Sequence, residues 1–369
     1  MKNPASSNHT SRKRVTIKVV AKEAGVSTQT VSRVLNDRVD VAPETRQRVK
    51  DVIQRLGYHP SAVARSLIQQ RSYALGVVTA GLDFHGPAQI LNGITQSVEA
   101  LGYSLLLKQL LDFQSENVDN VFQSLLARQV DGIIWSVPQV GDNQDWTSTI
   151  LPKVVVPVLF LTPHPGTNIA SISIDNYRGA CIATQHLLDQ GYRKIGHITG
   201  PLCWWEGRAR RNGWQDILTK FGISVNKNHW TEGDWSTFSG YAAGQKLLKQ
   251  YPDMEAVFVA NDQMALGLLK YVQDQHLSIP EDVAVVGFDG IPEAEYYMPS
   301  LSSVRQDLNQ LGCLAVETLI DMIERKEQDA GEQSDDGGHV NGSDSNTLQP
   351  QLIIRESSVL KQILPVVES

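Results

Sequence analysis

The body of this 369-residue chain, from about residue 73 onward, alternates apolar, β-branched stretches with amphipathic stretches of helical period. The apolar stretches are residues 74–79, 104–107, 132–136, 158–161, 171–174, 194–199, 256–260 and 283–288. The amphipathic stretches are residues 89–101, 118–128, 179–190, 208–220, 240–249 and 264–275. Strands and helices in alternation predict parallel sheets covered by helices on both faces. The number of strands exceeds one such sheet, so we predict two α/β lobes with a cleft at the carboxyl ends of their strands.

The first 71 residues differ in charge from everything after them. They contain 14 Lys or Arg against 5 Asp or Glu, whereas the remainder contains 19 against 35. This asymmetry predicts a basic module that binds a polyanion, joined to an acidic body. Residues 1–14 are polar, end in Ser-Arg-Lys-Arg and lack an apolar core. We expect them to be a disordered basic arm and not a signal peptide.

Residues 17–35 fit two short helices joined by a tight turn. Apolar residues recur at helical spacing in the first helix, at Ile17, Val20, Ala21 and Ala24. Gly25 can end that helix in the left-handed conformation, and Ser27 can cap the next one. The second helix then presents polar side chains outward: Thr28, Gln29, Ser32 and Arg33. This geometry predicts a helix-turn-helix whose second helix reads DNA, with an ordinary helical hairpin as the alternative.

Two further elements follow the pair. Pro43 can start a helix that keeps the 3.6-residue period as far as Leu56, and Gly57 can end it. Residues 60–67 are compatible with one more helix, which is too short to be stable alone. It would carry Arg65 for phosphates and Leu67 as an apolar wedge in the minor groove. A plain linker is the alternative for this stretch.

Polar and aromatic side chains follow several of the predicted strands. They are Asp175, Trp204, Trp205, Arg210, Trp235, Asn261, Asp262 and Asp289. Carboxylates, a carboxamide and a guanidinium beside indole rings suit a neutral polyol, which needs hydrogen bonds at its hydroxyls and stacking on its C–H face. Each residue also has an ordinary alternative. The acids and Asn261 could cap helices, Arg210 could be a surface charge, and the tryptophans could pack the lobes together.

Catalytic and membrane signatures are missing from the sequence. It has no G-x-G-x-x-G after a strand and no P-loop, H-E-x-x-H or G-x-S-x-G motif. Cys181, Cys203 and Cys313 are too few and too scattered for a zinc site or a disulfide framework. No stretch approaches about 18 uninterrupted apolar residues. We therefore expect no enzyme activity, no cofactor, no metal and no membrane span, in a cytoplasmic, nucleoid-associated protein.

Several motifs together resemble the lactose-repressor (LacI/GalR) family of bacterial transcription regulators, over nearly the whole chain. They are residues 21–33, 233–236 (Gly-Asp-Trp-Ser), 259–265 (Val-Ala-Asn-Asp-Gln-Met-Ala), 286–289 (Val-Gly-Phe-Asp) and 303–307 (Ser-Val-Arg-Gln-Asp). The resemblance implies an α/β protein with an N-terminal all-α helix-turn-helix headpiece, a hinge helix, and two Rossmann-like lobes of the periplasmic-binding-protein type.

We place the headpiece at residues 15–59, the hinge helix or linker at 60–72 and the core at 73–359. Within the core, one lobe takes residues 73–172 with 308–326, and the other takes 173–304 with 348–359. Residues 327–347 contain six acids, no Lys or Arg, and much Gly and Ser. That composition predicts a disordered acidic loop.

The resemblance also implies roles for individual residues. The DNA-binding positions are Thr16, Ser27, Thr28, Gln29, Thr30, Ser32, Arg33, Asn36, Ser61, Ala64, Arg65 and Leu67. The effector-binding positions in the cleft are Phe84, Ile90, Thr162, Asp175, Trp204, Glu206, Arg210, Trp235, Asn261, Asp289 and Gln306.

Some of these positions depart from the member after which the family is named. That protein has Tyr where this chain has Thr28 and Asp where it has Thr162, and it has small residues at the positions of Trp204 and Glu206. The departures favour a different operator and a different or larger sugar, such as a disaccharide or β-glycoside. The purine-binding branch of the family is a weaker candidate, because its extra effector Arg is replaced here by Trp204.

The function implied is that of a sequence-specific repressor of a sugar-utilisation operon. We expect a homodimer on near-palindromic double-stranded DNA, without a terminal coiled coil, because residues 359–367 offer no sustained heptads. A sugar in the cleft would favour one lobe orientation and release the operator. The rival interpretations are a sugar-binding receptor or carrier, which the basic helix-turn-helix argues against, and an NAD-dependent enzyme, which needs the missing glycine fingerprint.

Overall fold

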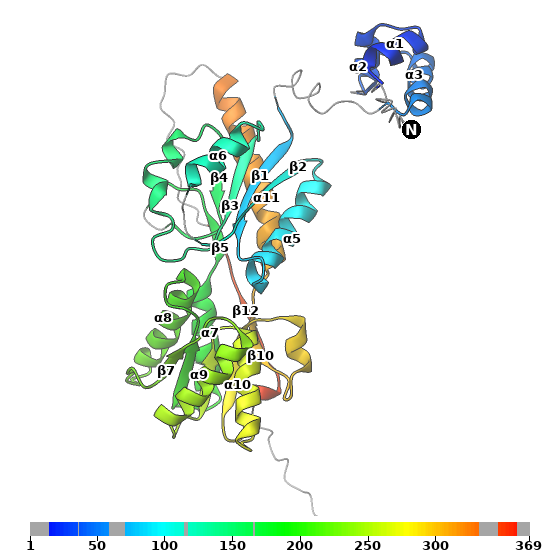
Figure 1. Cartoon of the computed structure of the whole chain (residues 1–369). Helices are drawn as coiled ribbons and strands as arrows, with labels where there is room; N and C mark the ends of the chain where they lie inside the picture. The colour runs from blue at the N-terminus through cyan, green and yellow to red at the C-terminus, as the bar shows by residue number, and fades with distance from the viewer. Residues whose placement is uncertain are drawn as a thin grey trace, which may run out of the picture. The chain divides into compact units, whose positions relative to one another are not determined.

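The computed structural model describes residues 15–35, 37–58, 71–113, 117–164, 167–331 and 346–359. The chain forms two compact units that divide between Ser72 and Tyr73 (Figure 1). Several predictions fall outside the described residues: the basic arm, Asn36, the hinge residues Ser61, Ala64, Arg65 and Leu67, and most of the acidic loop. None of the helices in the described ranges is long and apolar enough to cross a membrane.

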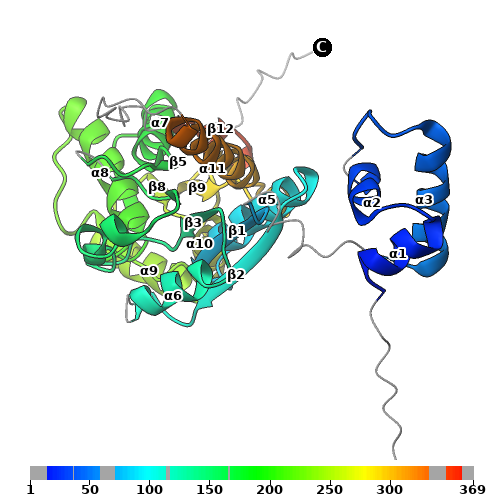
Figure 2. The same ribbon diagram turned by 90° about the horizontal axis from the view of Figure 1, so that it is seen from above.

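In the described residues 15–35 and 37–58, the N-terminal unit forms three helices, α1 (Ile17–Ala24), α2 (Thr28–Leu35) and α3 (Pro43–Leu56) (Figure 2). Apolar side chains of these helices form a small core. The predicted ends of these helices are confirmed. Gly25 and Gly57 end α1 and α3 with φ values of 65° and 58°. The Ser27 hydroxyl oxygen accepts the Thr30 N–H at 3.0 Å and caps α2. Helix α1 buries Val20, Ala21 and Ala24 of its predicted apolar stripe, and α2 buries Val31 and Val34.

The first lobe of the second unit is a parallel sheet in the order β2-β1-β3-β4. Its elements are β1 (Ala74–Ala80), α5 (His85–Ala100), β2 (Ser104–Leu110), α6 (Val118–Leu126), β3 (Gly132–Ser136), η1 (Asp145–Ser148), η2 (Leu151–Lys153), β4 (Val158–Phe160) and α11 (Leu308–Gly331). Leu75 and Val77 of β1 belong to the apolar cluster that α5 and α11 cover. Val78 and Ala80 belong to the cluster on the other face, with α6. Both faces of the sheet are therefore buried, as its continuous apolar strands predict.

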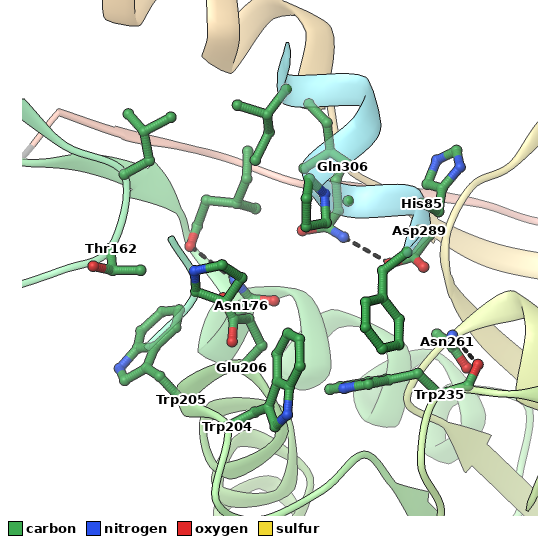
Figure 3. A pocket seen from close by; sticks show the side chains of 18 of the residues that line it. His85, Thr162, Asn176, Trp204, Trp205, Glu206, Trp235, Asn261, Asp289 and Gln306 are labelled. Atoms are coloured by element: carbon green, nitrogen blue, oxygen red, sulfur yellow. Dashed lines mark hydrogen bonds between the residues drawn. The ribbon is translucent and has the colours of Figure 1, made fainter. Parts of the chain in front are cut away.

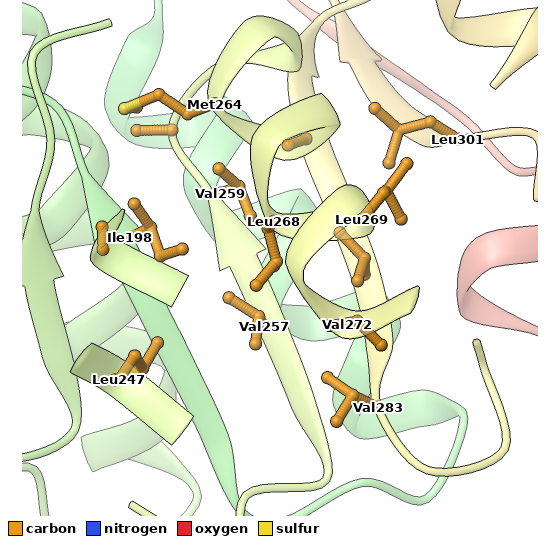
Figure 4. Packing of buried hydrophobic residues seen from close by; sticks show 14 of the residues in the cluster. Ile198, Leu247, Val257, Val259, Met264, Leu268, Leu269, Val272, Val283 and Leu301 are labelled. Atoms are coloured by element: carbon orange, nitrogen blue, oxygen red, sulfur yellow. The ribbon is translucent and has the colours of Figure 1, made fainter. Parts of the chain in front are cut away.

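The second lobe is a six-stranded sheet in the order β12-β10-β9-β8-β6-β7, in which β12 is antiparallel to its neighbour. Its strands are β6 (Ile195–Thr199), β7 (Trp230–Glu232), β8 (Ala256–Val259), β9 (Ala284–Asp289), β10 (Ser302–Arg305) and β12 (Gln351–Ile353). Its helices are α7 (Asn176–Asp189), α8 (Trp205–Lys220), α9 (Thr237–Gln250), α10 (Asp262–Asp274), η3 (Pro292–Tyr296) and η4 (Glu356–Ser358). Helices α7 and α8 cover one face. Helices α9 and α10 cover the other, where Met264, Leu268 and Val272 pack onto Val257 and Val259 (Figure 4).

A two-stranded parallel sheet lies where the chain passes between the lobes. It pairs β5 (Ile172–Ile174) with β11 (Asn346–Leu348). Ile172 and Ile174 are buried in the apolar cluster of the first lobe together with Leu311 of α11. The predicted lobe boundary between residues 172 and 173 is therefore corrected, because it would cut a strand that packs as one piece.

The predicted bounds of the acidic loop, residues 327 and 347, are also wrong. Residues 327–331 continue α11, and residues 346–347 belong to β11. Glu327, Gln328 and Ala330 are favourable helix formers, so an acidic run can extend a helix that is already packed. The other end is ordered by backbone pairing in which Asn346 lies opposite Ile172. The composition of residues 327–347 reveals neither the helix that they extend nor the strand with which they pair.

Helices α5 and α11 cross at two glycines. A Cβ atom on Gly93 would lie 2.0 Å from the carbonyl oxygen of Asn309, and one on Gly312 would lie 2.3 Å from that of Ile90. The two backbones can approach this closely only because neither position has a side chain. The crossing holds the first turns of α5 at the edge of the first lobe.

We expect Gly93→Ala to destabilise the protein by about 1–3 kcal/mol, because the added methyl group forces the two helices apart. Gly86→Ala, in the same helix, is the matched control: nothing lies within 4 Å of its Cβ position, so the better helix propensity of Ala should leave stability equal or higher. Thermal unfolding followed by circular dichroism compares the two variants. Equal losses in both would contradict the close crossing.

Candidate functional site

A pocket of about 370 Å³ lies between the two lobes, beside the carboxyl ends of β3, β8 and β9. Ten of the eleven predicted effector-binding residues line it: Phe84, Ile90, Thr162, Trp204, Glu206, Arg210, Trp235, Asn261, Asp289 and Gln306 (Figure 3). Apolar side chains of the first lobe, including Pro87, Leu161 and Leu308, complete the lining. This is the position in which open parallel sheets bind ligands.

A buried polar cluster centres on Arg210, which lies in the second turn of α8. Its Nε donates to Asn176 Oδ1 at 2.8 Å, and its Nη1 donates to the carbonyl oxygen of Ala260 and lies 3.4 Å from Asp289 Oδ1. Gln306 Nε2 donates to the same Asp289 oxygen at 2.7 Å. Burial raises the pKa of the Asp289 carboxyl, and the Arg210 guanidinium opposes that shift. Arg210 is thus an internal ion-pair partner, not the surface charge that the sequence left open.

The turn after β9 holds Asp289 in place. Asp289 has a φ of 111°, a strained conformation for a residue with a side chain. The fully buried Asp262 supports this turn: Oδ2 accepts the Ile291 N–H at 2.9 Å, and Oδ1 accepts the Ser303 hydroxyl at 2.6 Å. Ser303 in turn accepts the Gly290 N–H at 3.0 Å. Burial raises the pKa of Asp262 to about 8. Asp262 is the first residue of α10, and its side chain holds the turn that contains Asp289.

Three tryptophans form one side of the pocket: Trp204, Trp205 and Trp235 (Figure 3). The Trp204 ring lies edge-on to Trp235, with centroids 5.9 Å apart, and also 5.4 Å from Phe84 and 4.8 Å from Phe113 of the first lobe. The sequence left open whether Trp204 packs the lobes together or contacts a ligand. The ring both contacts the other lobe and lines the pocket.

Trp235 depends on two neighbours for its position. Its backbone has a φ of 75°, and Asn261 Nδ2 donates to its carbonyl oxygen at 3.0 Å. Asn261 Oδ1 accepts the Met264 N–H at 3.0 Å, so the same carboxamide caps α10. The indole lies against Gly200, where a Cβ atom would come within 2.0 Å of the ring. Asn261 is therefore both the helix cap that the sequence allowed and a support for the pocket wall.

The two lobes also contact each other through their backbones at the edge of the pocket. Val140 and Trp204 form an antiparallel bridge. The Gly141 N–H donates to the carbonyl oxygen of Cys203 at 2.8 Å, and the Trp205 N–H donates to that of Gln139 at 3.0 Å. The segment that carries the tryptophans is thus hydrogen-bonded directly to the first lobe.

Asp175 is corrected as a pocket residue. Its carboxylate accepts the Arg178 N–H at 2.8 Å and caps α7, and it is absent from the lining. An N-cap side chain folds back onto its own helix, so the next residue, Asn176, faces the pocket. His85 was not predicted as a site residue, and it lines the pocket from the first turn of α5. Helices α5, α7, α8 and α10 all begin two to four residues earlier than the apolar period indicated.

The predicted outer face of α2 is also present in the N-terminal unit. Thr28, Gln29 and Arg33 are exposed on it, as is Thr16 before α1. Thr30 and Ser32 are half-buried, and Ser27 is exposed at the cap. Arg33 lies 3.4 Å from Asp40, with both side chains about half exposed. A solvent-exposed ion pair of this kind contributes little stability. The Arg33 guanidinium can therefore exchange Asp40 for another anion.

We expect Gly200→Ala to displace the Trp235 ring and to destabilise the second lobe by about 1–3 kcal/mol. Trp235→Leu removes the six-membered ring whose atoms the new methyl group would meet, so it should relieve much of that loss. A double-mutant cycle measured by thermal unfolding tests the coupling. Additive losses would show that the glycine does not make room for the indole.

Comparisons with known proteins bear on both units. The model of bacterial regulatory proteins of the lacI family matches residues 16–61, and that of the periplasmic binding protein-like domain matches residues 184–358. The lactose operon repressor of Escherichia coli (strain K12) is 34% identical over 310 residues, covering 84% of this chain and 85% of that protein.

Two solved structures are similar over most of the chain. The lac repressor dimer bound to operator and the anti-inducer ONPF has a TM-score of 0.82 at 32% identity, covering 94% of this chain and 100% of that one. The complex of the transcriptional regulator CelR with cellobiose has a TM-score of 0.64 at 29% identity, covering 93% of this chain and 100% of that one. With the helix-turn-helix headpiece and the two-lobed core, these matches establish that the chain belongs to the LacI family and is a DNA-binding transcriptional repressor.

Proposed function

We propose that this repressor controls a sugar-utilisation operon and that a sugar bound in the pocket releases it from its operator. The observation that carries the proposal is the polar cluster of Arg210, Asp289 and Gln306 beside the three indoles. Charged and amide groups form directional hydrogen bonds with hydroxyls, and indole faces stack on the C–H face of a pyranose. A sugar ring offers both surfaces at once.

The pocket supports a sugar larger than a monosaccharide. Its volume, about 370 Å³, is within the usual range for small-ligand sites. The polar cluster supplies groups for hydrogen bonding, and the three indoles beside it supply apolar surface for stacking. A disaccharide or β-glycoside would occupy both. The ligand named for one similar structure, cellobiose, is a disaccharide.

The lobe contacts at Trp204 provide a means of switching. A ligand between the lobes touches Phe84 and Ile90 on one side and Arg210 and Trp235 on the other, so it favours the lobe orientation that satisfies both. We propose that residues 60–67 order on DNA in a different orientation. The operator affinity then changes only as far as the sugar distinguishes the two states.

On the DNA side, we propose that the exposed face of α2 reads the operator in the major groove and that Leu67 enters the minor groove. Two headpieces would be needed for a near-palindromic site, and we propose a homodimer. Leu266, Tyr296 and Met298 form an exposed apolar face on the second lobe, which a second copy would cover. A similar structure is described as a dimer bound to operator. We propose that the dimer acts on the nucleoid, in the cytoplasm.

A thermal-shift screen of mono- and disaccharides on the full chain tests the sugar. We expect at least one disaccharide or β-glycoside to raise the melting temperature and to weaken operator binding in a competition assay, because ligand binding to one state stabilises that state. If no sugar in a broad panel changed either quantity, the effector proposal would be abandoned.

We expect Arg33→Ala to weaken operator binding by about 1–3 kcal/mol while non-specific binding changes little, because a base contact is lost. Arg48→Ala, an exposed arginine of α3 outside the proposed contact face, is the matched control. Fluorescence anisotropy on operator and scrambled duplexes separates the two affinities. Equal losses on both duplexes would assign Arg33 to phosphate contact alone.

A further inference from the structure

Two buried polar atoms of the pocket wall have no hydrogen-bond partner among the residues that the structure describes. They are Oε2 of Glu206, in the first turn of α8, and Nε1 of Trp235. Both residues line the pocket (Figure 3). A buried acceptor or donor without a partner is unfavourable, so these atoms indicate what a ligand must offer. It must donate to Glu206 and accept from Trp235.

The charges around the pocket restrict the ligand further. Among the described lining residues, Arg210 is the one Lys or Arg, and Asp83, Glu206 and Asp289 are acids. Arg210 is already paired with Asp289 and donates to Asn176. Glu206 is half-buried, with its Oε2 atom fully buried, and it forms no ion pair among the described residues; the Arg210 and Arg208 charges act on it only at longer range. Burial raises the pKa of its carboxyl, as expected where the charged form is poorly solvated.

Other possible anion-binding groups near Glu206 are engaged elsewhere. The N–H of Trp205, at the start of α8, donates to the carbonyl oxygen of Gln139. Arg208 donates to the carbonyl oxygens of Leu202 and Cys203 at 3.0 and 2.8 Å. The Arg211 guanidinium lies over the ring of Trp230. The first N–H of the helix and the Arg208 guanidinium are therefore engaged, and Arg211, which lies over Trp230, is not among the residues that line the pocket.

We propose that the effector is an uncharged glycoside that donates a hydroxyl to Glu206 and accepts from the indole N–H of Trp235, and that the pocket rejects sugars carrying a phosphate or carboxylate. This inference rests on the proposed sugar-binding function and narrows its ligand class. An anion here would face the carboxyl groups of Asp289 and Glu206, while Arg210, the one Lys or Arg among the described lining residues, is already paired with Asp289. A hydroxyl instead completes the bonds that Glu206 and Trp235 lack.

The test compares neutral sugars with their 6-phosphates on the full chain by isothermal titration calorimetry. The pairs are cellobiose, lactose and maltose, each with the 6-phosphate on its non-reducing ring. We expect a neutral sugar to bind at least about 100-fold more tightly than its phosphate, a difference of about 3 kcal/mol. Equal or tighter binding of a phosphorylated member would overturn this inference and leave the proposed sugar-effector function standing. Binding of no member of any pair would overturn both.

The variant Glu206→Gln tests the residue itself. It keeps the size of the side chain but removes its charge, so affinity for the neutral sugar should fall about tenfold and the gap to its phosphate should narrow. Glu281→Gln, an exposed acid outside the pocket, should change neither quantity. Melting temperatures of the ligand-free variants verify that both fold. Unchanged affinities in Glu206→Gln would overturn the role of Glu206.

Discussion

The buried ion pair of Arg210 and Asp289 joins segments that lie far apart in the sequence. Arg210 comes from α8, Asp289 from the end of β9, Asn176 from the start of α7 and Gln306 from the segment after β10. Breaking such a pair leaves an uncompensated buried charge, which typically costs about 3–5 kcal/mol. The folded second lobe must therefore hold these four segments in fixed relative positions, and the pocket lies where they meet.

The remaining features of the pocket extend this arrangement outward. Asp262 and Ser303 hold the turn in which Asp289 lies, and Asn261 holds the backbone of Trp235. Trp204 then carries the wall across to the first lobe through ring contacts and a backbone bridge. One side chain thus both lines the pocket and contacts the other lobe.

Residues whose structural role depends on near neighbours in the chain could be predicted from the sequence. Gly25 and Ser27 follow from turn and cap geometry, and the apolar period located most helices and strands of the core. It was less accurate at the first turns of α5, α7, α8 and α10, since those turns face the pocket and lack the apolar stripe that marks a packed helix. Asp175 is the clearest example: the sequence predicted it in the cleft, but its carboxylate caps α7 and the next residue, Asn176, lines the pocket instead.

The sequence by itself determined the helix-turn-helix, the alternating α/β body and the family, because these depend on short-range spacing and on motifs within single segments. Only the tertiary structure decided that β5 belongs with the first lobe, that Arg210 is already paired, and that Oε2 of Glu206 has no hydrogen-bond partner among the described residues. Each of these depends on a partner many residues away. Pairing, burial and the hydrogen bonds left unmade are properties of the folded arrangement, and they restrict the ligand more narrowly than residue types do.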